Sequence, residues 1–136
     1  MTPPTQSIRC HCGSELLFTH CCEPHLQQSQ PIRTPEALLR ARYSAYCRGD
    51  LGFIEATMTT TANADYDPET TRQWLSQTTW LGLEISQVHP THNPNQACIS
   101  FATRFTNRGQ TFRVTEDASF ECINNQWYYN GAHKHS

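Results

Sequence analysis

Cysteine spacing near the N-terminus constrains this chain more than any other feature of its sequence. Cys10 and Cys12 flank a single residue, and Cys21 and Cys22 follow after a spacer of eight residues that begins with Gly13. The surrounding segment is short and hydrophilic, so it offers no apolar core in which four cysteines could be buried as ordinary small side chains. Four soft ligands brought together by a chain reversal suit a tetrahedral Zn²⁺ site, with Zn–S bonds of about 2.3 Å. Iron–sulfur clusters use other spacings.

The spacing alone leaves the fourth ligand open. Cys21 and Cys22 are adjacent, and where only one of them binds the metal, His11, His20 or His25 would take the remaining position. A site closed by four protein ligands has no position left for a water molecule. We therefore expect a structural Zn²⁺ that folds this segment rather than one that activates water.

The N-terminal composition indicates a reducing compartment. Residues 1–12 are rich in Thr, Pro and Gln and lack the apolar stretch of a secretory signal. The chain has seven cysteines, an odd number that cannot all pair internally. Closely spaced cysteines in a reducing compartment bind metal more often than they form disulfides. We therefore expect a cytoplasmic protein.

Length and charge exclude several classes of protein. A chain of 136 residues has room for one full-sized core. Its 10 Lys and Arg residues against 12 Asp and Glu residues give a formal net charge of -2. That balance argues against a general binder of nucleic acid or of anionic membranes, which would carry a basic excess. No stretch approaches the roughly 18 consecutive apolar residues of a membrane span, so we expect no membrane association.

Composition divides the chain into three parts. Residues 1–26 carry the cysteine cluster and are called the knuckle here. Residues 27–33 are polar, contain Pro31 and are predicted to form a linker. Residues 34–136 hold most of the large apolar side chains and are predicted to form the main domain.

The main domain is predicted to be α+β. Thr34, Asp50 and Asp67 each stand where they can cap a helix, and Pro follows Thr34 and Asp67 at the first helical position. From Thr79 onward apolar and polar residues alternate, which is the spacing of strands. The predicted strands cover residues 81–86, 99–105, 112–122 and 126–129. Three helices followed by four strands, without βαβ alternation, indicate helices packed on one face of an antiparallel sheet.

The knuckle resembles the SEC-C motif, a zinc-binding element found at the C-terminus of the preprotein translocase ATPase and in many bacterial proteins. The motif reads CPCGS, then a short basic stretch, then CC or CH; here residues 10–14 read CHCGS and residues 21–22 read CC. The resemblance implies that all four clustered cysteines are zinc ligands. Two features depart from the motif: His11 replaces the proline, and residues 15–20 lack the lysines of the translocase version.

The remainder of the chain is similar to the YchJ family of small bacterial proteins. The stretches that carry this similarity are ARYSAY at 41–46, WLGL at 80–83, ISFATRF at 99–105 and QWYY at 126–129. The similarity implies that residues from about 30 onward form a cone-shaped α+β domain of the nuclear-transport-factor-2-like or cystatin-like kind. In that fold three helices pack on a curved antiparallel sheet.

Glu116 and Arg42 are the candidate residues for a ligand pocket in the cone. Glu116 falls in register with the apolar residues of its strand, so an unbroken strand turns its carboxylate toward the apolar side. Burial raises the pKa of such a carboxylate unless a cation compensates, and Arg42 on the first helix could be that cation. The alternative interpretations are a buried structural ion pair and a bulge that turns Glu116 outward.

Other chemically reactive residues give weaker signals. His89 and His92 flank a proline without a carboxylate on a defined element, which is typical of exposed loop histidines. Three arginines near one hairpin suggest a small basic patch: Arg104, Arg108 and Arg113. Three isolated cysteines on apolar elements are predicted to be small core residues: Cys47, Cys98 and Cys122.

The sequence favours a zinc-binding protein without catalytic activity that recognises a protein partner through the knuckle. No set of residues marks a nucleophile, so no catalytic residue is assigned. The alternative is an enzyme or binder of a small molecule that uses the cone interior, with Glu116 as the acid or base and Arg42 beside it. A third hypothesis is contact with RNA or ribosomes through the knuckle and the arginine-bearing hairpin.

Overall fold

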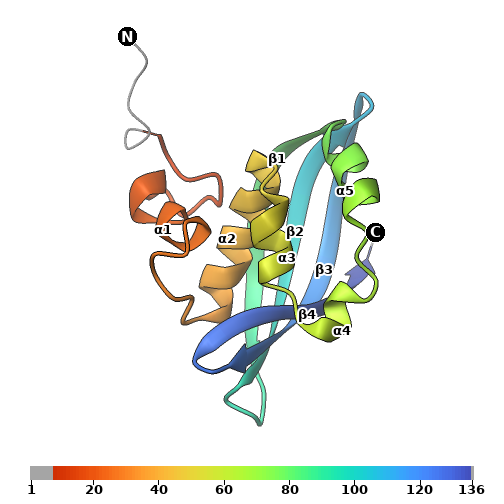
Figure 1. The fold of residues 1–136 in the computed structure, drawn as a ribbon. Coiled ribbons are helices and arrows are strands. Elements are labelled where there is room, and N and C mark those ends of the chain that lie inside the picture. The colour runs from red at the N-terminus through yellow and green to blue at the C-terminus, as the bar shows by residue number, and fades with distance from the viewer. Residues whose placement is uncertain (1–7, 136) are drawn as a thin grey trace.

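A curved antiparallel sheet with its helices on the concave side forms the main body of the molecule (Figure 1). The structure, a computed structural model, describes residues 8–135, with side chains up to residue 132. The strands pair in the order β1-β2-β3-β4, each antiparallel to the next. They span β1 (Thr78–Pro90), β2 (Gln96–Asn107), β3 (Gln110–Ile123) and β4 (Gln126–His135). The predicted α+β class is confirmed.

The three predicted helices form, and the capping residues explain where they begin. They are α2 (Pro35–Arg48), α3 (Leu51–Ala56) and α5 (Pro68–Leu75). The side chains of Thr34, Asp50 and Asp67 each accept a hydrogen bond from a backbone N–H in the first turn, at 3.1 Å in all three cases. Gly49 ends α2 in the left-handed conformation, with φ of 70°.

Three short elements were not predicted from the sequence. They are the 3₁₀ turn η2 (Phe18–His20), α1 (Glu23–Leu26) and α4 (Thr60–Asn63). Each is a single turn, which is too short to show a helical repeat of apolar residues.

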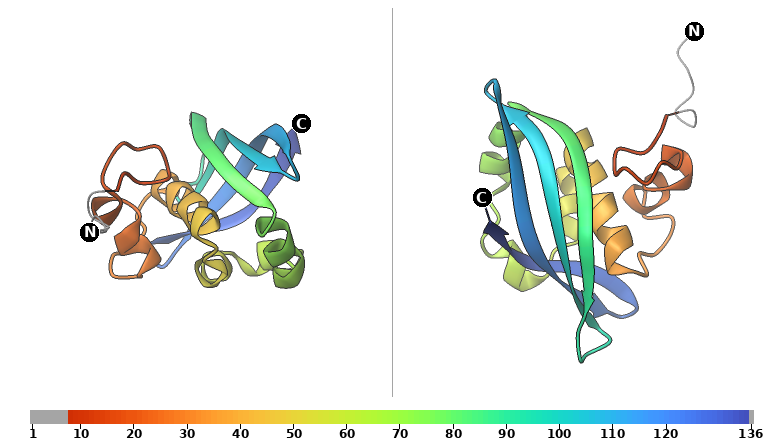
Figure 2. Two further views of the ribbon diagram at one scale, coloured as in Figure 1. Left: turned by 90° about the horizontal axis from the view of Figure 1, so that it is seen from above. Right: turned by 180° about the vertical axis from the view of Figure 1, so that it is seen from behind.

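The sheet curves because β1 is irregular. Its pairing with β2 shifts register between Trp80 and Gly82 and again between Ile85 and Gln87. An extra residue in one strand bends it and increases its twist. A Cβ at position 82 would lie 3.1 Å from Nη2 of Arg104, so glycine leaves room for that side chain beside the bend. Seen from above, the sheet wraps around α2, and from behind its other face carries no helix of the described chain (Figure 2).

The knuckle and the main domain share one continuous core. Cys12, Phe18 and Cys22 are buried in the same apolar cluster as Leu38 and Phe120 of the main domain. A short hydrophilic segment therefore gains a core because it packs against the main domain.

Residues 27–33 are held against β4 at their C-terminal end. Ile32 is only 3% exposed and belongs to the core cluster. The backbone N–H of Trp127 donates to the Ile32 carbonyl at 3.1 Å, and its indole Nε1–H donates to the Arg33 carbonyl at 3.1 Å. This segment thus ends in fixed contacts that tie the knuckle to the far strand of the sheet.

We expect Ile32→Ala to lower the free energy of unfolding by roughly 2–5 kcal/mol, because it removes buried methyl groups and leaves a cavity. Urea denaturation followed by circular dichroism measures the change. Ile123→Ala is the matched control, since that side chain is 43% exposed and should lose much less. Equal losses in the two variants would show that Ile32 contributes no more than a surface residue.

Candidate metal centre and cavity

The four clustered cysteines converge on one point. Their Sγ atoms all lie within 4.8 Å of one another. The distance from Cys12 Sγ to Cys21 Sγ is 3.6 Å, and that from Cys21 Sγ to Cys22 Sγ is 3.9 Å. A tetrahedron with metal–sulfur bonds of about 2.3 Å has sulfur–sulfur edges of about 3.8 Å. The arrangement is therefore compatible with a tetrahedral metal site.

The geometry favours Cys22 over a histidine as the fourth ligand. Cys22 is 1% exposed and its sulfur belongs to the cluster. His11 and His20 are exposed, and neither is part of the group of candidate ligands. His25 also lies outside that group, with its Nδ1 3.4 Å from the Gln30 carbonyl oxygen.

Local backbone geometry explains how the first two cysteines approach the second pair. Gly13 adopts φ of 83°, in the left-handed region that favours glycine, and reverses the chain directly after Cys12. The N–H of Cys10 donates to the Leu16 carbonyl at 2.8 Å, which closes the resulting loop. The Ser14 hydroxyl lies 3.1 Å from Cys21 Sγ. The CxCGS pattern thus supplies two ligands, a turn and a polar contact to a third sulfur.

Helix α2 provides the platform for the cluster. The Ser44 hydroxyl, fully buried, lies 3.4 Å from Cys10 Sγ. Arg40 donates from Nη1 to the Cys12 carbonyl at 2.8 Å. The guanidinium of Arg48 lies 4.6 Å from the centre of the Phe18 ring. Three polar side chains on successive turns of α2 therefore fix the knuckle, and one of them, Ser44, contacts a sulfur directly.

The thiols of the cluster compete for negative charge. Hydrogen bonds from Cys10 and Cys22 lower the pKa of Cys12. Burial raises the pKa of Cys21 to about 11, and the hydrogen bonds with Cys10 and Cys12 raise that of Cys22. Sulfurs this close cannot all ionise without a cation among them, whereas a divalent metal stabilises several thiolates at once.

We expect Cys22→Ser to weaken metal binding by more than tenfold. Even mutation of a residue that only hydrogen-bonds to a metal ligand lowers the affinity for the metal by about 10–100-fold. Competition with a chromogenic chelator measures the change. His25→Ala and Cys98→Ser should bind metal as the parent chain does, because neither side chain is in the cluster. Loss in His25→Ala with retention in Cys22→Ser would place the histidine in the site.

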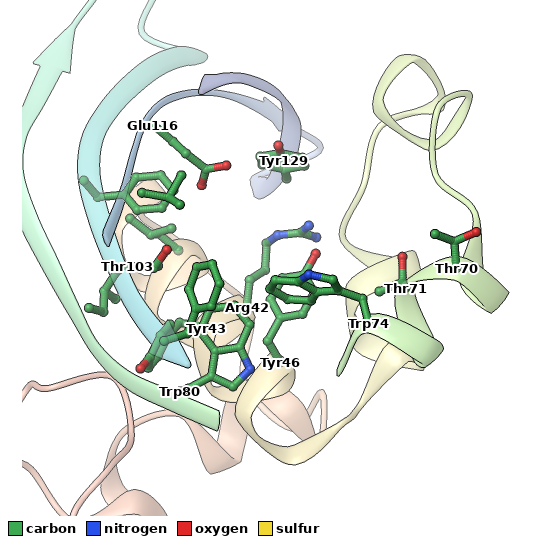
Figure 3. Close-up of a pocket in the computed structure, with 15 residues that line it drawn as sticks. Arg42, Tyr43, Tyr46, Thr70, Thr71, Trp74, Trp80, Thr103, Glu116 and Tyr129 are labelled. Carbon is green, nitrogen blue, oxygen red and sulfur yellow. The ribbon is translucent and has the colours of Figure 1, made fainter. Parts of the chain in front are cut away.

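A cavity of about 470 Å³ lies between α2, α5 and the concave face of the sheet (Figure 3). Most of its walls are aromatic or aliphatic. Its lining residues with aromatic rings are Tyr43, Tyr46, Trp74, Trp80, Phe101, Phe105 and Tyr129. Arg42 and Glu116 supply the charged side chains of the lining.

Arg42 is buried and held from one side. It is 5% exposed, and Nη1 donates to the Ile54 carbonyl at 2.9 Å and to the Thr57 hydroxyl at 2.8 Å. Its guanidinium lies 4.3 Å from the centre of the Tyr129 ring, a cation–π contact. Burial lowers the pKa of Arg42, but a guanidinium stays protonated at neutral pH.

Glu116 lies across the cavity from Arg42, on β3. The two side chains approach Tyr129 from different sides, and no ion pair joins them (Figure 3). Burial, followed by the nearby Glu116 carboxylate, raises the pKa of Tyr129 to about 12. The structure therefore places both candidate residues in the cavity, with Tyr129 as a neighbour of each.

Trp80 is the centre of the aromatic wall, and sequence reasoning did not single it out. Its ring contacts Tyr43, Trp74 and Phe105 with centroid distances between 5.4 and 5.7 Å. Its indole Nε1 is buried without a hydrogen-bond partner among residues 8–132. The aromatic content of the sequence was the available signal for such a wall. The alternation of residues within a strand cannot predict which rings come together, because these rings lie on five different elements.

The remaining candidates lie apart from both sites. His89 was predicted to lie in a loop with His92, but it belongs to β1. Its Nε2 lies 2.9 Å from the Ser100 hydroxyl of β2. Arg108 and Arg113 bond to Gln77 and Glu84, at 2.9 and 3.0 Å.

The isolated cysteines are only partly buried. Cys47 and Cys122 pack against the core as predicted, although neither is fully enclosed. Cys98 was wrongly predicted to be a core residue: it lies between the buried Ala97 and Ile99, outside the core cluster. Since side chains of a strand alternate, Cys98 shares the opposite face from Ile99.

No helix in the described part of the chain is long and apolar enough to cross a membrane.

Comparisons with known proteins agree with the geometry. The family model described as YchJ, middle NTF2-like domain, matches residues 34–132. A UPF0225 protein from Geobacter sulfurreducens is 32% identical over 121 residues, which cover 88% of this chain and 75% of that protein. A UPF0225 protein from Pectobacterium carotovorum is 33% identical over 135 residues, which cover 93% of this chain and 84% of that protein.

Solved structures share the whole arrangement. A SEC-C motif containing protein from Rhodopseudomonas palustris matches with a TM-score of 0.84 and 26% identity, over 93% of this chain and 98% of that one. Another, from Psychrobacter arcticus, matches with a TM-score of 0.79 and 25% identity, over 93% and 82% of the two chains. The cone fold also recurs in a protein of Exiguobacterium sibiricum described as a putative Ca/calmodulin-dependent kinase II association domain. That match has a TM-score of 0.56 and 14% identity over 82% of this chain and 92% of that one, which shows the fold alone.

Proposed function

Because the chain belongs to the YchJ family of UPF0225 proteins, we propose that it is a zinc-binding accessory protein. In this proposal the metal site fixes the knuckle onto the cone, and the role of the protein is binding rather than catalysis. The observation that carries this proposal is the convergence of Cys10, Cys12, Cys21 and Cys22 within 4.8 Å, on a platform made by α2. The SEC-C motif proteins that match its whole fold support the proposal.

Zinc is the metal that best suits this donor set. Four thiolates within one small cluster form a soft, tetrahedral environment, which disfavours calcium and magnesium because they require oxygen ligands. Four protein ligands leave no position for a reacting water, so the metal would be structural. Zinc binding of this kind contributes on the order of 10 kcal/mol to folding. A thiolate site also suits the reducing conditions of the cytoplasm, where we place the protein.

We expect the chain purified without added zinc to contain about one equivalent of zinc, measured by mass spectrometry of the metal. Removing the metal with a strong chelator should lower the Tm of the whole molecule, because the sulfurs belong to the common core. Less than a tenth of an equivalent of any metal, or an unchanged Tm after removal, would contradict a structural zinc site.

The surface beside the metal centre is where we place a protein partner. An open groove next to the cysteines is lined by Leu16 and His20 of the knuckle, Pro35 and Arg40 of α2, and Val88 of β1. Leu16 is 53% exposed and Val88 41% exposed, so this surface presents apolar side chains beside the cysteine cluster. RNA or ribosome contact is the weaker proposal, since Arg108 and Arg113 are already bonded within the sheet.

We expect Leu16→Asp to bind zinc normally yet lose the partner, because the substitution changes an exposed side chain and leaves the four sulfurs in place. Affinity purification from the native host, with zinc analysis of the same samples, measures both properties. The double variant Cys10→Ser/Cys12→Ser should lose both. Ile123→Asp, on the β3–β4 hairpin, is the control for an added surface charge. Unchanged partners in Leu16→Asp would remove the groove from consideration.

A second candidate function is the binding of a small molecule in the cone. The specific observation in its favour is that Arg42, a buried charged residue, lines a cavity of about 470 Å³. Cavities of about 300–1,000 Å³ with apolar walls and few polar groups are typical of ligand sites. Glu116 is the residue in the lining that could accept or donate a proton, and we retain it as the candidate acid or base of this alternative.

A further inference from the structure

The charge of Arg42 is not neutralised by any carboxylate within ion-pair distance among residues 8–132. The ion pairs between described side chains involve Arg40, Arg72 and Arg113 instead. A buried charge without an opposite charge beside it is costly, and hydrogen bonds to a carbonyl and a hydroxyl recover only part of that cost. A counter-ion from outside the chain would complete the site.

The guanidinium has donors directed toward the cavity. Its hydrogen bonds to Ile54 and Thr57 both use Nη1. The Tyr46 hydroxyl is a further hydrogen-bond partner of the guanidinium and lies close to it (Figure 3). Nε and Nη2 carry three N–H groups, so N–H groups are left for an acceptor in the cavity. Two adjacent N–H groups of a guanidinium match the two oxygens of a carboxylate.

The cavity walls select for a flat apolar body. Trp74, Trp80 and Phe105 contact one another through edges and tilted faces, with centroid distances from 5.2 to 5.7 Å. Such rings offer planar surfaces to an aromatic guest. Trp74 is 38% exposed, so this wall reaches the solvent and provides an entrance.

The charges of the described lining suit a guest with a single negative charge. Arg42 is the cation among the described residues of the lining. A doubly charged phosphate would find only one cation among these residues. A cationic guest would be repelled by the buried guanidinium in the same cavity. A monocarboxylate meets neither obstacle.

We propose that the cavity binds a planar aromatic monocarboxylate, with its carboxylate on Arg42 and its ring against Trp74, Trp80 and Phe105. The proposal rests on the second candidate function, the binding of a small molecule in the cone, and specifies the chemical class of that ligand. The cavity shares no lining residue with the cysteine cluster or with the partner groove.

Three probes of equal shape test the charge of the guest: 2-naphthoate, the neutral 2-naphthamide and the cationic 2-naphthylmethylammonium. We expect 2-naphthoate to bind the metal-loaded full chain at least tenfold more tightly than the other two in isothermal titration calorimetry. In NMR spectra the indole N–H signals of Trp74 and Trp80 should shift. The signal of Trp127 should stay, because its Nε1 donates to the Arg33 carbonyl outside the lining.

Variants separate the role of charge from that of fold. Arg42→Gln should abolish the preference for 2-naphthoate, whereas Arg42→Lys should retain part of it. Since Arg42 also holds Ile54 and Thr57, these variants can lose stability, and Trp74→Ala provides a second measurement at a partly exposed side chain. We expect Trp74→Ala to weaken the binding of 2-naphthoate and of 2-naphthamide by the same factor, on the order of threefold or more, because it removes a ring of the wall and no charge.

Equal binding of 2-naphthoate and 2-naphthamide, with the indole shifts present, would overturn the anionic ligand while leaving the cavity as a small-molecule site. Tighter binding of the ammonium probe would overturn it in favour of a cation. Binding of no probe at all would contradict both the monocarboxylate and the second candidate function.

Discussion

Helix α2 is the element on which both candidate sites depend. Arg40 and Ser44 hold the cysteine cluster, and Arg42 and Tyr46 line the cavity. The helix is buried almost continuously from Leu38 to Ala45, with the knuckle on one side and the sheet on the other. A helix with two covered faces cannot shift toward one without disturbing the other, because protein interiors are close-packed. The geometry of the cysteine cluster and the shape of the cavity are therefore mechanically connected through α2.

The curvature of the sheet decides that a cavity exists. Two irregularities in β1 bend the sheet around α2, and Gly82 at the first of them leaves room for the Arg104 side chain. A flat sheet would bring its apolar side chains into direct contact with the helices. The bend instead leaves a space in which residues from six elements face one another, with aromatic walls and few charges.

Much of the fold follows from local signals in the sequence. Thr34, Asp50 and Asp67 predicted three helix starts because a cap acts within a single turn. Alternation predicted four strands, and the cysteine spacing predicted a chain reversal between the two cysteine pairs. The short helices were missed since one turn carries no repeat. Ile32, an isolated apolar residue in a polar segment, gave no local sign that it is 3% exposed beneath β4.

The sequence by itself determined that four cysteines form the candidate metal centre and that the main domain is α+β, because spacing and alternation are properties of neighbours along the chain. Only the tertiary structure decided which groups meet across long separations. It placed Cys22 rather than a histidine in the cluster and brought Ser44 and Arg40 of α2 against it. It also placed Arg42 against Ile54, Thr57 and Tyr129, without an ion pair to Glu116. Such contacts depend on how α2 packs against the curved sheet, and no local pattern encodes that packing.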